Sequence, residues 1–186
     1  MAGSETDEAL MALVAARNQR ALRVLMDRHM GRAIGLAIRV AGNAEADDIA
    51  QEAFLRVWSR AGSFNPETGR FTTWLYRIVV NLAIDARRRP RHGPVDEALE
   101  VPSGDPGPAE ELIAAEQHRS LTRAMAALPE RQRAAIALFH MEGLSGREAA
   151  KAMGMSEKAF ESLLTRARSA LKAQVEKTNV TNGRCR

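Results

Sequence analysis

The chain has 186 residues, enough for one or two domains, and its net charge of +4 and sequence pI ≈ 9.8 suit a polyanionic partner without requiring one. The longest apolar run, residues 33–42, is short and broken by Arg39, and the first twenty residues carry charges throughout, so we expect neither a membrane span nor a signal sequence. The single cysteine, Cys185, cannot form an internal disulfide, and we therefore expect a reducing, cytoplasmic setting.

The first ninety residues are predicted to form helices. Apolar residues recur at helical spacing over residues 7–14, 19–40, 45–60 and from after a Thr72 cap to about Arg89. Residues 61–70 form a predicted loop, because they contain Gly62, the Asn65-Pro66 pair and Gly69. No convincing alternating pattern of a strand is present.

The predicted helix over residues 45–60 has two different faces. Ile49, Phe54 and Val57 can enter a core. A second stripe holds Asp48, Gln51, Glu52 and Leu55. A leucine surrounded by carboxylates and an amide is typical of a protein-docking surface, but periodicity alone equally allows a helix buried on both sides.

The next predicted helix also has two stripes. One is apolar, and the other holds Trp74, Arg77, Asn81, Asp85 and Arg88. This second stripe, beside a loop that contains Phe64, suits single-stranded nucleic acid, because aromatic rings stack on bases and arginine neutralises phosphate. The competing interpretation is that Trp74 simply packs in the core.

An acidic linker is predicted in the middle of the chain. Residues 89–108 contain five prolines and three glycines, and residues 95–116 contain seven carboxylates with no lysine or arginine. The sequence therefore predicts an all-α protein with two small helical domains joined by an acidic Pro/Gly-rich linker. The expected boundaries are 1–89 for the first domain, 90–108 for the linker, 109–175 for the second domain and 176–186 for a disordered tail.

Residues 144–171 have the layout of a helix-turn-helix. Ser145 and Glu148 have the spacing of a capping box, Gly154 can end the first helix in the left-handed conformation, and Ser156 can cap the second helix. The second helix combines an apolar stripe with a basic and polar face, as expected of a helix that enters the major groove. An ordinary helical hairpin with a solvated outer face is the alternative.

The sequence contains no constellation that indicates catalysis. His29, His92, His118 and His140 lack paired ligand spacing and have no cysteine cluster beside them. We therefore expect no catalytic residues, no metal and no cofactor. One function that fits these features is a transcriptional regulator that binds a palindromic duplex site by itself through the helix-turn-helix, although a repressor needs neither the Leu55 stripe nor the Trp74 stripe.

Two segments, AEADDIAQEAFLRVWSRAGSF and GRFTTWLYRIVVNLAIDARRR, resemble the second conserved region of bacterial sigma factors. A third, LPERQRAAIALFHMEGLSGREAAKAMGMSEKAFESLLTRARSAL, resembles their fourth region. With these two regions alone and a short linker, the chain resembles the extracytoplasmic-function (ECF) group. The resemblance covers nearly all of residues 7–175.

The resemblance implies an RNA polymerase sigma factor that binds core polymerase, recognises promoter DNA and promotes strand opening. Core polymerase would contact Asp47, Asp48, Gln51, Glu52, Leu55 and Arg56 through the coiled coil of its largest subunit. The melted proximal promoter element would contact Phe64, Asn65, Trp74, Arg77, Asn81, Asp85, Arg87 and Arg88. The duplex distal element would contact Ser156, Glu157, Lys158, Glu161, Ser162, Thr165 and Arg166.

The chain departs from the family pattern in its predicted recognition helix. Many relatives carry lysine or arginine where Glu161 stands, and a second arginine where Leu163 stands. Because a carboxylate can accept a hydrogen bond from a cytosine amino group, we expect Glu161 to contribute specificity for the distal element. The resemblance also admits an anti-sigma protein that covers the docking and DNA-binding surfaces.

Overall fold

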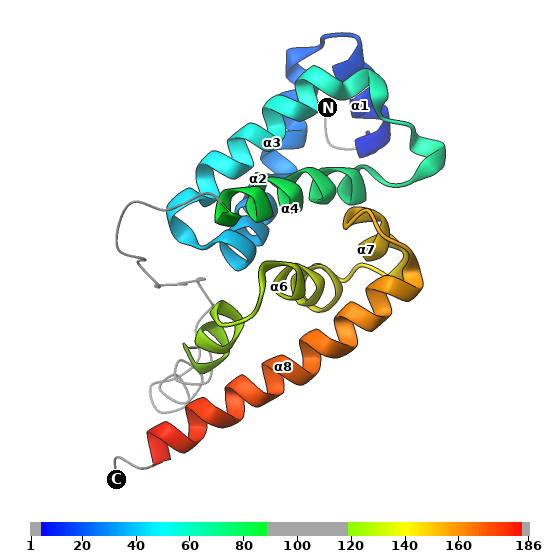
Figure 1. Ribbon diagram of the computed structural model, residues 1–186. Helices are drawn as coiled ribbons and strands as arrows, with labels where there is room; N and C mark the ends of the chain where they lie inside the picture. Colours follow the sequence, from blue (N-terminus) through cyan, green and yellow to red (C-terminus); the bar gives the residue numbers. More distant parts are fainter. Residues whose placement is uncertain (1–4, 89–118, 184–186) are drawn as a thin grey trace.

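The structure is a computed structural model that describes residues 5–88 and 119–183, with side chains to residue 177. All regular structure in these ranges is helical, in agreement with the predicted fold class (Figure 1). The predicted linker at residues 90–108 and the expected start of the second domain at residue 109 lie outside the described residues.

The first domain consists of four helices that pack around the second of them. Their bounds are α1 (Asp7–Ala15), α2 (Gln19–Ala41), α3 (Ala46–Arg60) and α4 (Phe71–Arg88). Thr6 caps α1 and Asn18 caps α2, each accepting a main-chain hydrogen bond through its side chain. The predicted start of α4 after Thr72 is wrong, because the helix begins at Phe71.

The loop between α3 and α4 is built from two short 3₁₀ turns, Ala61–Ser63 and Pro66–Thr68. Asn65 stabilises the second turn, because its side-chain oxygen accepts a hydrogen bond of 2.9 Å from the Glu67 N–H. The sequence prediction of a loop over residues 61–70 is thus confirmed, and the loop has a defined conformation.

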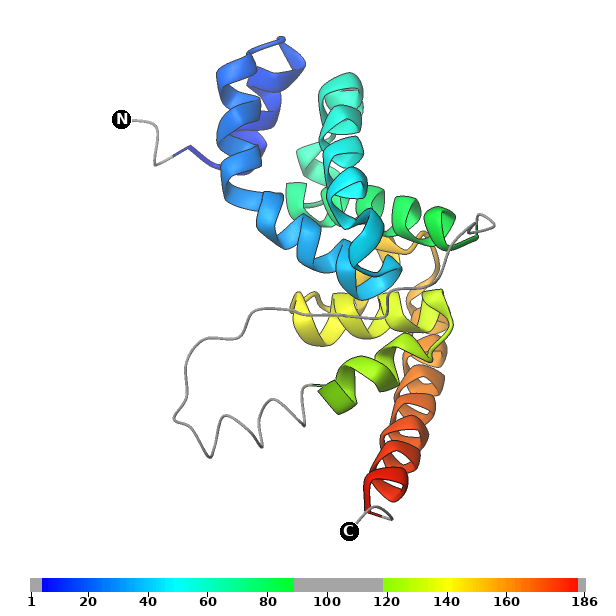
Figure 2. The same ribbon diagram turned by 90° about the vertical axis from the view of Figure 1, so that its left-hand side faces the viewer.

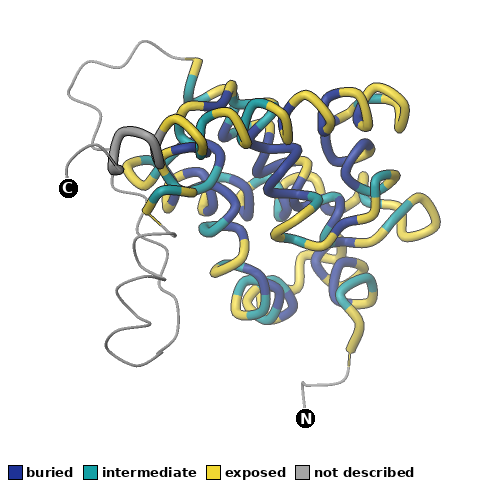
Figure 3. The backbone as a smooth tube through the Cα atoms, turned by 90° about the horizontal axis from the view of Figure 1, so that it is seen from below, coloured by how far each residue is buried: buried dark blue, intermediate teal, exposed yellow. Residues whose placement is uncertain are grey.

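The core of the first domain is formed by the apolar stripes of all four helices (Figure 3). Its fully buried members include Val14, Leu25, Leu36, Val57, Phe71, Leu75 and Val79. Burial of one such side chain contributes roughly 1.5–3 kcal/mol, so these stripes supply most of the drive to fold.

The second domain contains the predicted helix-turn-helix. Residues 119–126 are helical and are followed by α6 (Glu130–Ile136), a π-helical turn (Ala137–Met141), α7 (Gly146–Ala152) and α8 (Glu157–Gly183). The capping box before α7 has both of its hydrogen bonds, since Ser145 Oγ accepts from Glu148 N–H at 3.2 Å and Glu148 Oε2 accepts from Ser145 N–H at 3.0 Å. Gly154 follows α7 with a φ of +65°, and Ser156 Oγ accepts from Ala159 N–H at 3.3 Å.

Helix α8 is longer than the sequence predicted. It continues through residues 176–183, where a disordered tail was expected. Residues 157–182 contain neither glycine nor proline, so nothing in the sequence ends the helix before Gly183. This corrects the predicted boundary of the tail.

The two domains pack against each other, a relationship that the sequence left open. Helix α7 lies against α4, and α6 lies against α2 (Figures 1 and 2). The guanidinium of Arg133, only 2% exposed, donates from Nη1 to the Val40 carbonyl of the first domain at 3.1 Å. Glu142 binds Tyr76 and Arg39 of the first domain through its carboxylate.

Candidate functional site

The polar stripe of α3 faces solvent. Leu55 is 64% exposed, and Asp47, Asp48 and Gln51 are exposed beside it. The opposite face of the helix is buried through Ile49, Phe54 and Val57. The alternative in which Leu55 lies in the core is therefore wrong, and an apolar side chain stands in a ring of polar groups on an open surface.

Two features of α3 partly offset the negative charge of the carboxylates on this surface. Asp47 and Asp48 stand in the first turn, where the unpaired N–H groups of the helix favour carboxylates. Glu52 is partly neutralised by Arg56, whose Nε donates to Glu52 Oε1 at 2.9 Å. This half-exposed i,i+4 pair contributes about 0.3–0.5 kcal/mol. Its main effect is to orient the two side chains next to Leu55.

The loop and the start of α4 form an aromatic pocket. The rings of Phe64 and Trp74 lie 5.6 Å apart between centroids, and both are half-buried. The pocket is also lined by Asn65, Thr73 and Arg77, and its volume is ≈ 200 Å³. Most ligand pockets measure about 300–1,000 Å³, so this one suits a small planar group such as a single base. Trp74 accordingly both packs on the core and lines the pocket.

One positively charged side chain that lines the pocket was not predicted from the sequence. Lys151 of α7 lines it from the second domain. Its Nζ would lie 3.0 Å from a Cβ placed on Gly69, so a side chain at Gly69 would displace the lysine. No sequence signal could have placed Lys151 here, because its position depends on how the two domains pack.

A neighbouring cleft brings the loop together with the helix-turn-helix. Thr68 and Arg70 line it from the first domain, and Arg147, Glu148 and Glu157 line it from the second. Arg70 lies 3.9 Å from Glu148 between Nε and Oε1. Hydrogen bonds from the Ser145 side chain and main chain hold the pKa of Glu148 below its ordinary value, so this carboxylate remains ionised beside the arginine.

The second half of α4 lines a polar groove. Asn81, Asp85 and Arg88 line it together with Arg56 of α3 and Arg131 of α6. Three guanidinium groups and one carboxylate make the groove basic, which suits a phosphate backbone. The groove thus joins a residue predicted to bind polymerase to residues predicted to bind promoter DNA. Arg87 is half-buried and is not among the groove residues.

All seven residues predicted to read the distal element are exposed at the start of α8 or at its cap. The opposite stripe, with Phe160 and Ala167 at 0% exposure, packs against the domain. Ser162 and Thr165 donate their hydroxyl hydrogens to main-chain carbonyls four residues earlier, at 3.0 and 2.9 Å. The exposed charged side chains on this part of the helix are Glu157, Lys158, Glu161 and Arg166, and Arg166 Nε donates to the Ser162 carbonyl at 3.2 Å.

Within the described residues, no group of three or more histidine, cysteine, aspartate or glutamate side chains is arranged to hold a metal ion. In the same part of the chain, no helix has the length and apolarity needed to cross a bilayer. The fold and its surfaces together define an all-helical protein of two domains, the second of which carries a DNA-binding helix-turn-helix.

Comparisons with known proteins identify the family. The family model "Sigma-70 region 2" matches residues 25–92, and "Sigma-70, region 4" matches residues 118–171. The sigma factor NccH of Alcaligenes xylosoxydans xylosoxydans is 36% identical in an alignment 188 residues long, and this alignment spans 97% of this chain and 100% of NccH. The ECF sigma-E factor of Escherichia coli (strain K12) is 33% identical over 183 residues, covering 92% of this chain and 95% of that protein.

A further relative is longer than this chain. The probable sigma factor RfaY of Xanthomonas campestris pv. campestris is 36% identical in an alignment 149 residues long, and this alignment spans 77% of this chain but 37% of RfaY. Among solved structures, CnrH in complex with the cytosolic domain of CnrY aligns with a TM-score of 0.66 and 31% identity, over 93% of this chain and 99% of CnrH.

The chain therefore belongs to the sigma-70 family of RNA polymerase sigma factors, in its ECF group. It is a transcription initiation factor, a role that differs from that of a catalyst. The polymerase-independent regulator is not favoured, since both matched regions are those of sigma factors.

Proposed function

We propose that this sigma factor docks on core polymerase through the outward face of α3. The observation that carries the proposal is Leu55, a large apolar side chain that is 64% exposed among polar groups. Such an apolar anchor with a polar rim is typical of binding hot spots. The proposed contact residues are Asp47, Asp48, Gln51, Glu52, Leu55 and Arg56.

The aromatic pocket and the outer face of α4 are proposed to hold the melted strand of the proximal promoter element. Phe64 and Trp74 offer ring faces to an unstacked base, and Arg77 and Arg88 are exposed for phosphate contacts. The proposed contact residues are Phe64, Asn65, Trp74, Arg77, Asn81, Asp85, Arg87 and Arg88. Capture of the strand would offset the few kcal/mol needed to unstack a base.

The start of α8 is proposed to read the distal promoter element as duplex DNA. Helix-turn-helix proteins contact base edges with the N-terminal residues of their second helix. The proposed residues are Ser156, Glu157, Lys158, Glu161, Ser162, Thr165 and Arg166, all of them exposed. Because both DNA-binding surfaces are on one chain bound to polymerase, the second contact becomes effectively intramolecular.

We also propose that the protein acts in the cytoplasm, has no catalytic activity of its own, and is regulated by an anti-sigma protein. The solved structure of CnrH contains the cytosolic domain of CnrY, which gives a precedent for a protein partner. We further propose that the first domain covers residues 1–89, the linker residues 90–108 and the second domain residues 109–175.

The experiment combines polymerase binding with transcription. Leu55→Asp is expected to lower the affinity for purified core polymerase at least about tenfold, because it places a charge in an apolar contact. Leu13→Asp is the matched control, since Leu13 is also exposed, at 38%, but lies on α1. Trp74→Ala is expected to leave polymerase binding intact and to abolish run-off transcripts. Equal polymerase binding by the wild-type protein and Leu55→Asp would contradict the docking surface.

A further inference from the structure

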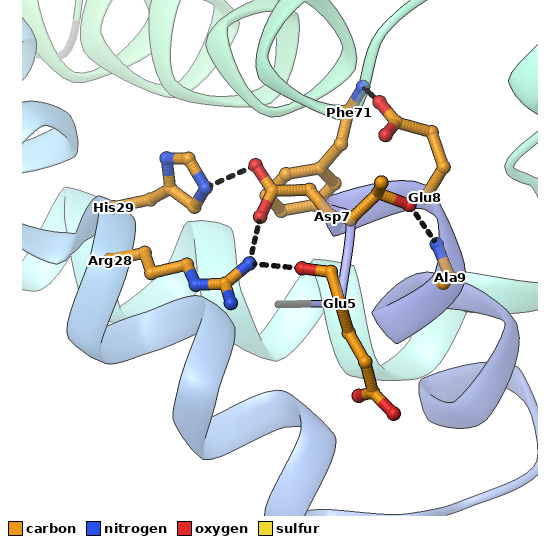
Figure 4. Close-up of polar contacts among 8 residues, drawn as sticks. Glu5, Asp7, Glu8, Ala9, Arg28, His29 and Phe71 are labelled. Atoms are coloured by element: carbon orange, nitrogen blue, oxygen red, sulfur yellow. Dashed lines mark hydrogen bonds and ion pairs between the residues drawn. The ribbon is translucent and has the colours of Figure 1, made fainter. Parts of the chain in front are cut away.

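The first turn of α1 contacts the start of α4, the helix that carries Trp74 (Figure 4). Glu8 Oε1 accepts a hydrogen bond of 3.1 Å from the N–H of Phe71, the first residue of α4. The two residues are 63 positions apart in the sequence. The family match to region 2 begins only at residue 25, so it does not include Glu8.

Glu8 supplies a cap that the sequence around α4 does not provide. The first N–H groups of a helix need acceptors from outside the helix, and a carboxylate is favoured there by the helix dipole. The residue before α4 is Arg70, whose side chain has no acceptor atom. A carboxylate from α1 therefore takes the place of a local N-cap side chain.

Asp7 fixes the turn of α1 that carries Glu8. Its Oδ1 accepts from Arg28 Nη1 at 2.9 Å, and its Oδ2 accepts from His29 Nε2 at 2.6 Å. The same Arg28 Nη1 donates to the main-chain carbonyl of Glu5 at 2.8 Å. Helix α1 is thereby held on α2 by a half-buried network, as Figure 4 shows.

The same network reaches the aromatic pocket through Phe71. The Phe71 ring is completely buried and lies edge-on to the His29 ring at 5.3 Å between centroids. It also lies 6.3 Å from the Phe64 ring and 6.4 Å from the Trp74 ring. Since Phe64 and Trp74 line the pocket, a shift of Phe71 would move both of them.

We propose that Asp7 and Glu8 are positioning residues for proximal promoter recognition. Through Phe71 they set the start of α4 and the separation of the two rings that line the pocket. Helix α1 thus contributes to promoter recognition by positioning α4, although no residue of α1 lines the pocket itself. This inference rests on the proposed role of the pocket in binding the melted strand.

The test compares Glu8→Ala, Glu8→Gln and Glu8→Asp in the full chain bound to core polymerase. The probe is a forked promoter DNA with a single-stranded non-template tail. Glu8→Ala is expected to weaken binding of the fork about fivefold or more, because the Phe71 N–H loses its acceptor. Glu8→Gln keeps an Oε1 acceptor and should bind within about twofold of wild type. Glu8→Asp, which keeps the charge but is shorter, should bind with intermediate affinity.

Two controls separate positioning from a general loss of folding. Glu5→Ala is matched, because the Glu5 side chain is exposed and its contact uses only the main-chain carbonyl. Core polymerase affinity should stay unchanged in every Glu8 variant. In a Trp58→Phe background Trp74 is the remaining tryptophan, and its emission should shift to longer wavelength in Glu8→Ala but not in Glu8→Gln.

The outcomes distinguish this inference from the proposed function. If Trp74→Ala weakens fork binding and Glu8→Ala and Glu8→Asp do not, the positioning role is wrong and the pocket role stands. If none of these changes weakens fork binding, the pocket role itself fails. If Glu8→Ala and Glu8→Asp lower the affinity for core polymerase as much as the affinity for the fork, Glu8 serves only the folding of the domain. That result would overturn the inference.

Discussion

The hydroxyl of Tyr76 donates a hydrogen bond of 2.8 Å to Oε2 of Glu142, and this contact joins α4 of the first domain to the turn before the helix-turn-helix. The side chain of Glu142 is only 4% exposed, and its Oε1 accepts from Arg39 Nη1 at 3.0 Å. Arg32 approaches the same carboxylate at 3.5 Å. One buried carboxylate from the second domain is thus held by three side chains of the first.

Glu142→Gln should loosen the packing of the domains. The amide cannot balance the charge of Arg39, so the free energy of unfolding should fall by about 1–3 kcal/mol in chemical denaturation. Small-angle X-ray scattering should show a larger radius of gyration. Glu176→Gln makes the same change at an exposed position of α8 and should alter neither quantity. An unchanged radius and stability in Glu142→Gln would show that this contact does not hold the domains together.

Tyr76 should make the protein less stable at alkaline pH. Burial, followed by the negative charge of Glu142, raises the pKa of Tyr76 above its ordinary value of 10.0. Above pH 10 the unfolded chain releases this proton while the folded protein keeps it, so stability is intact below that pH and falls as pH rises above it. Tyr76 is the only tyrosine, and tyrosinate absorbance should therefore appear together with unfolding. Absorbance that rises near pH 10 while the circular dichroism stays native would contradict this.

The comparison with Tyr76→Phe isolates the contribution of this proton. Lysines titrate in the same pH range in both proteins, so their effect cancels. The variant should be less stable at pH 7, because it loses the hydrogen bond to Glu142, but its stability should depend less on pH between about 9 and 11. Parallel pH profiles for the two proteins would assign the alkaline loss of stability to other groups.

Replacement of Arg133 by lysine should destabilise the protein. Its guanidinium donates to the Val40 carbonyl at 3.1 Å, to the Ala126 carbonyl at 3.0 Å and to the Leu128 carbonyl at 2.9 Å. An ammonium group cannot match this planar set of donors, so Arg133→Lys should lower the free energy of unfolding by about 2–4 kcal/mol. Arg131→Lys, at an exposed position on the same helix, should change it by less than about 0.5 kcal/mol. Equal urea midpoints for the two variants would contradict this role.

Local patterns predicted most of the helices, whereas contacts between distant segments were not predictable. The apolar spacing of α2 and α3 and the Ser145–Glu148 capping box each depend on residues close in sequence. The start of α4 was missed because its acceptor, Glu8, comes from α1, while Thr72 was the best local candidate. The exposure of Leu55 was left open because periodicity does not show which of two faces is covered.

The domain interface shows the same limit. Glu142 and Tyr76 are 66 residues apart, and neither belongs to a motif that indicates a partner. The place of Lys151 in the aromatic pocket likewise depends on α7 packing against α4. Long-range polar contacts of this kind carry no periodic signal, because a single side chain on each side is enough to form them.

Glu161 should contribute base preference in the distal promoter element. It is exposed on α8 one turn before Thr165, whose hydroxyl donates to the Glu161 main-chain carbonyl, so the carboxylate itself is not engaged by that contact. Because a carboxylate can accept a hydrogen bond from a cytosine amino group, Glu161→Ala should relax selection at one distal position by about 1–3 kcal/mol, measured by binding to a set of single-base promoter variants. Glu161→Lys should instead raise affinity for all sequences and steepen the dependence on salt, because it adds a phosphate contact. Glu176→Ala, which removes a carboxylate from a later turn of the same helix, is the control. Unchanged base preference at every distal position in Glu161→Ala would remove this residue from the recognition surface.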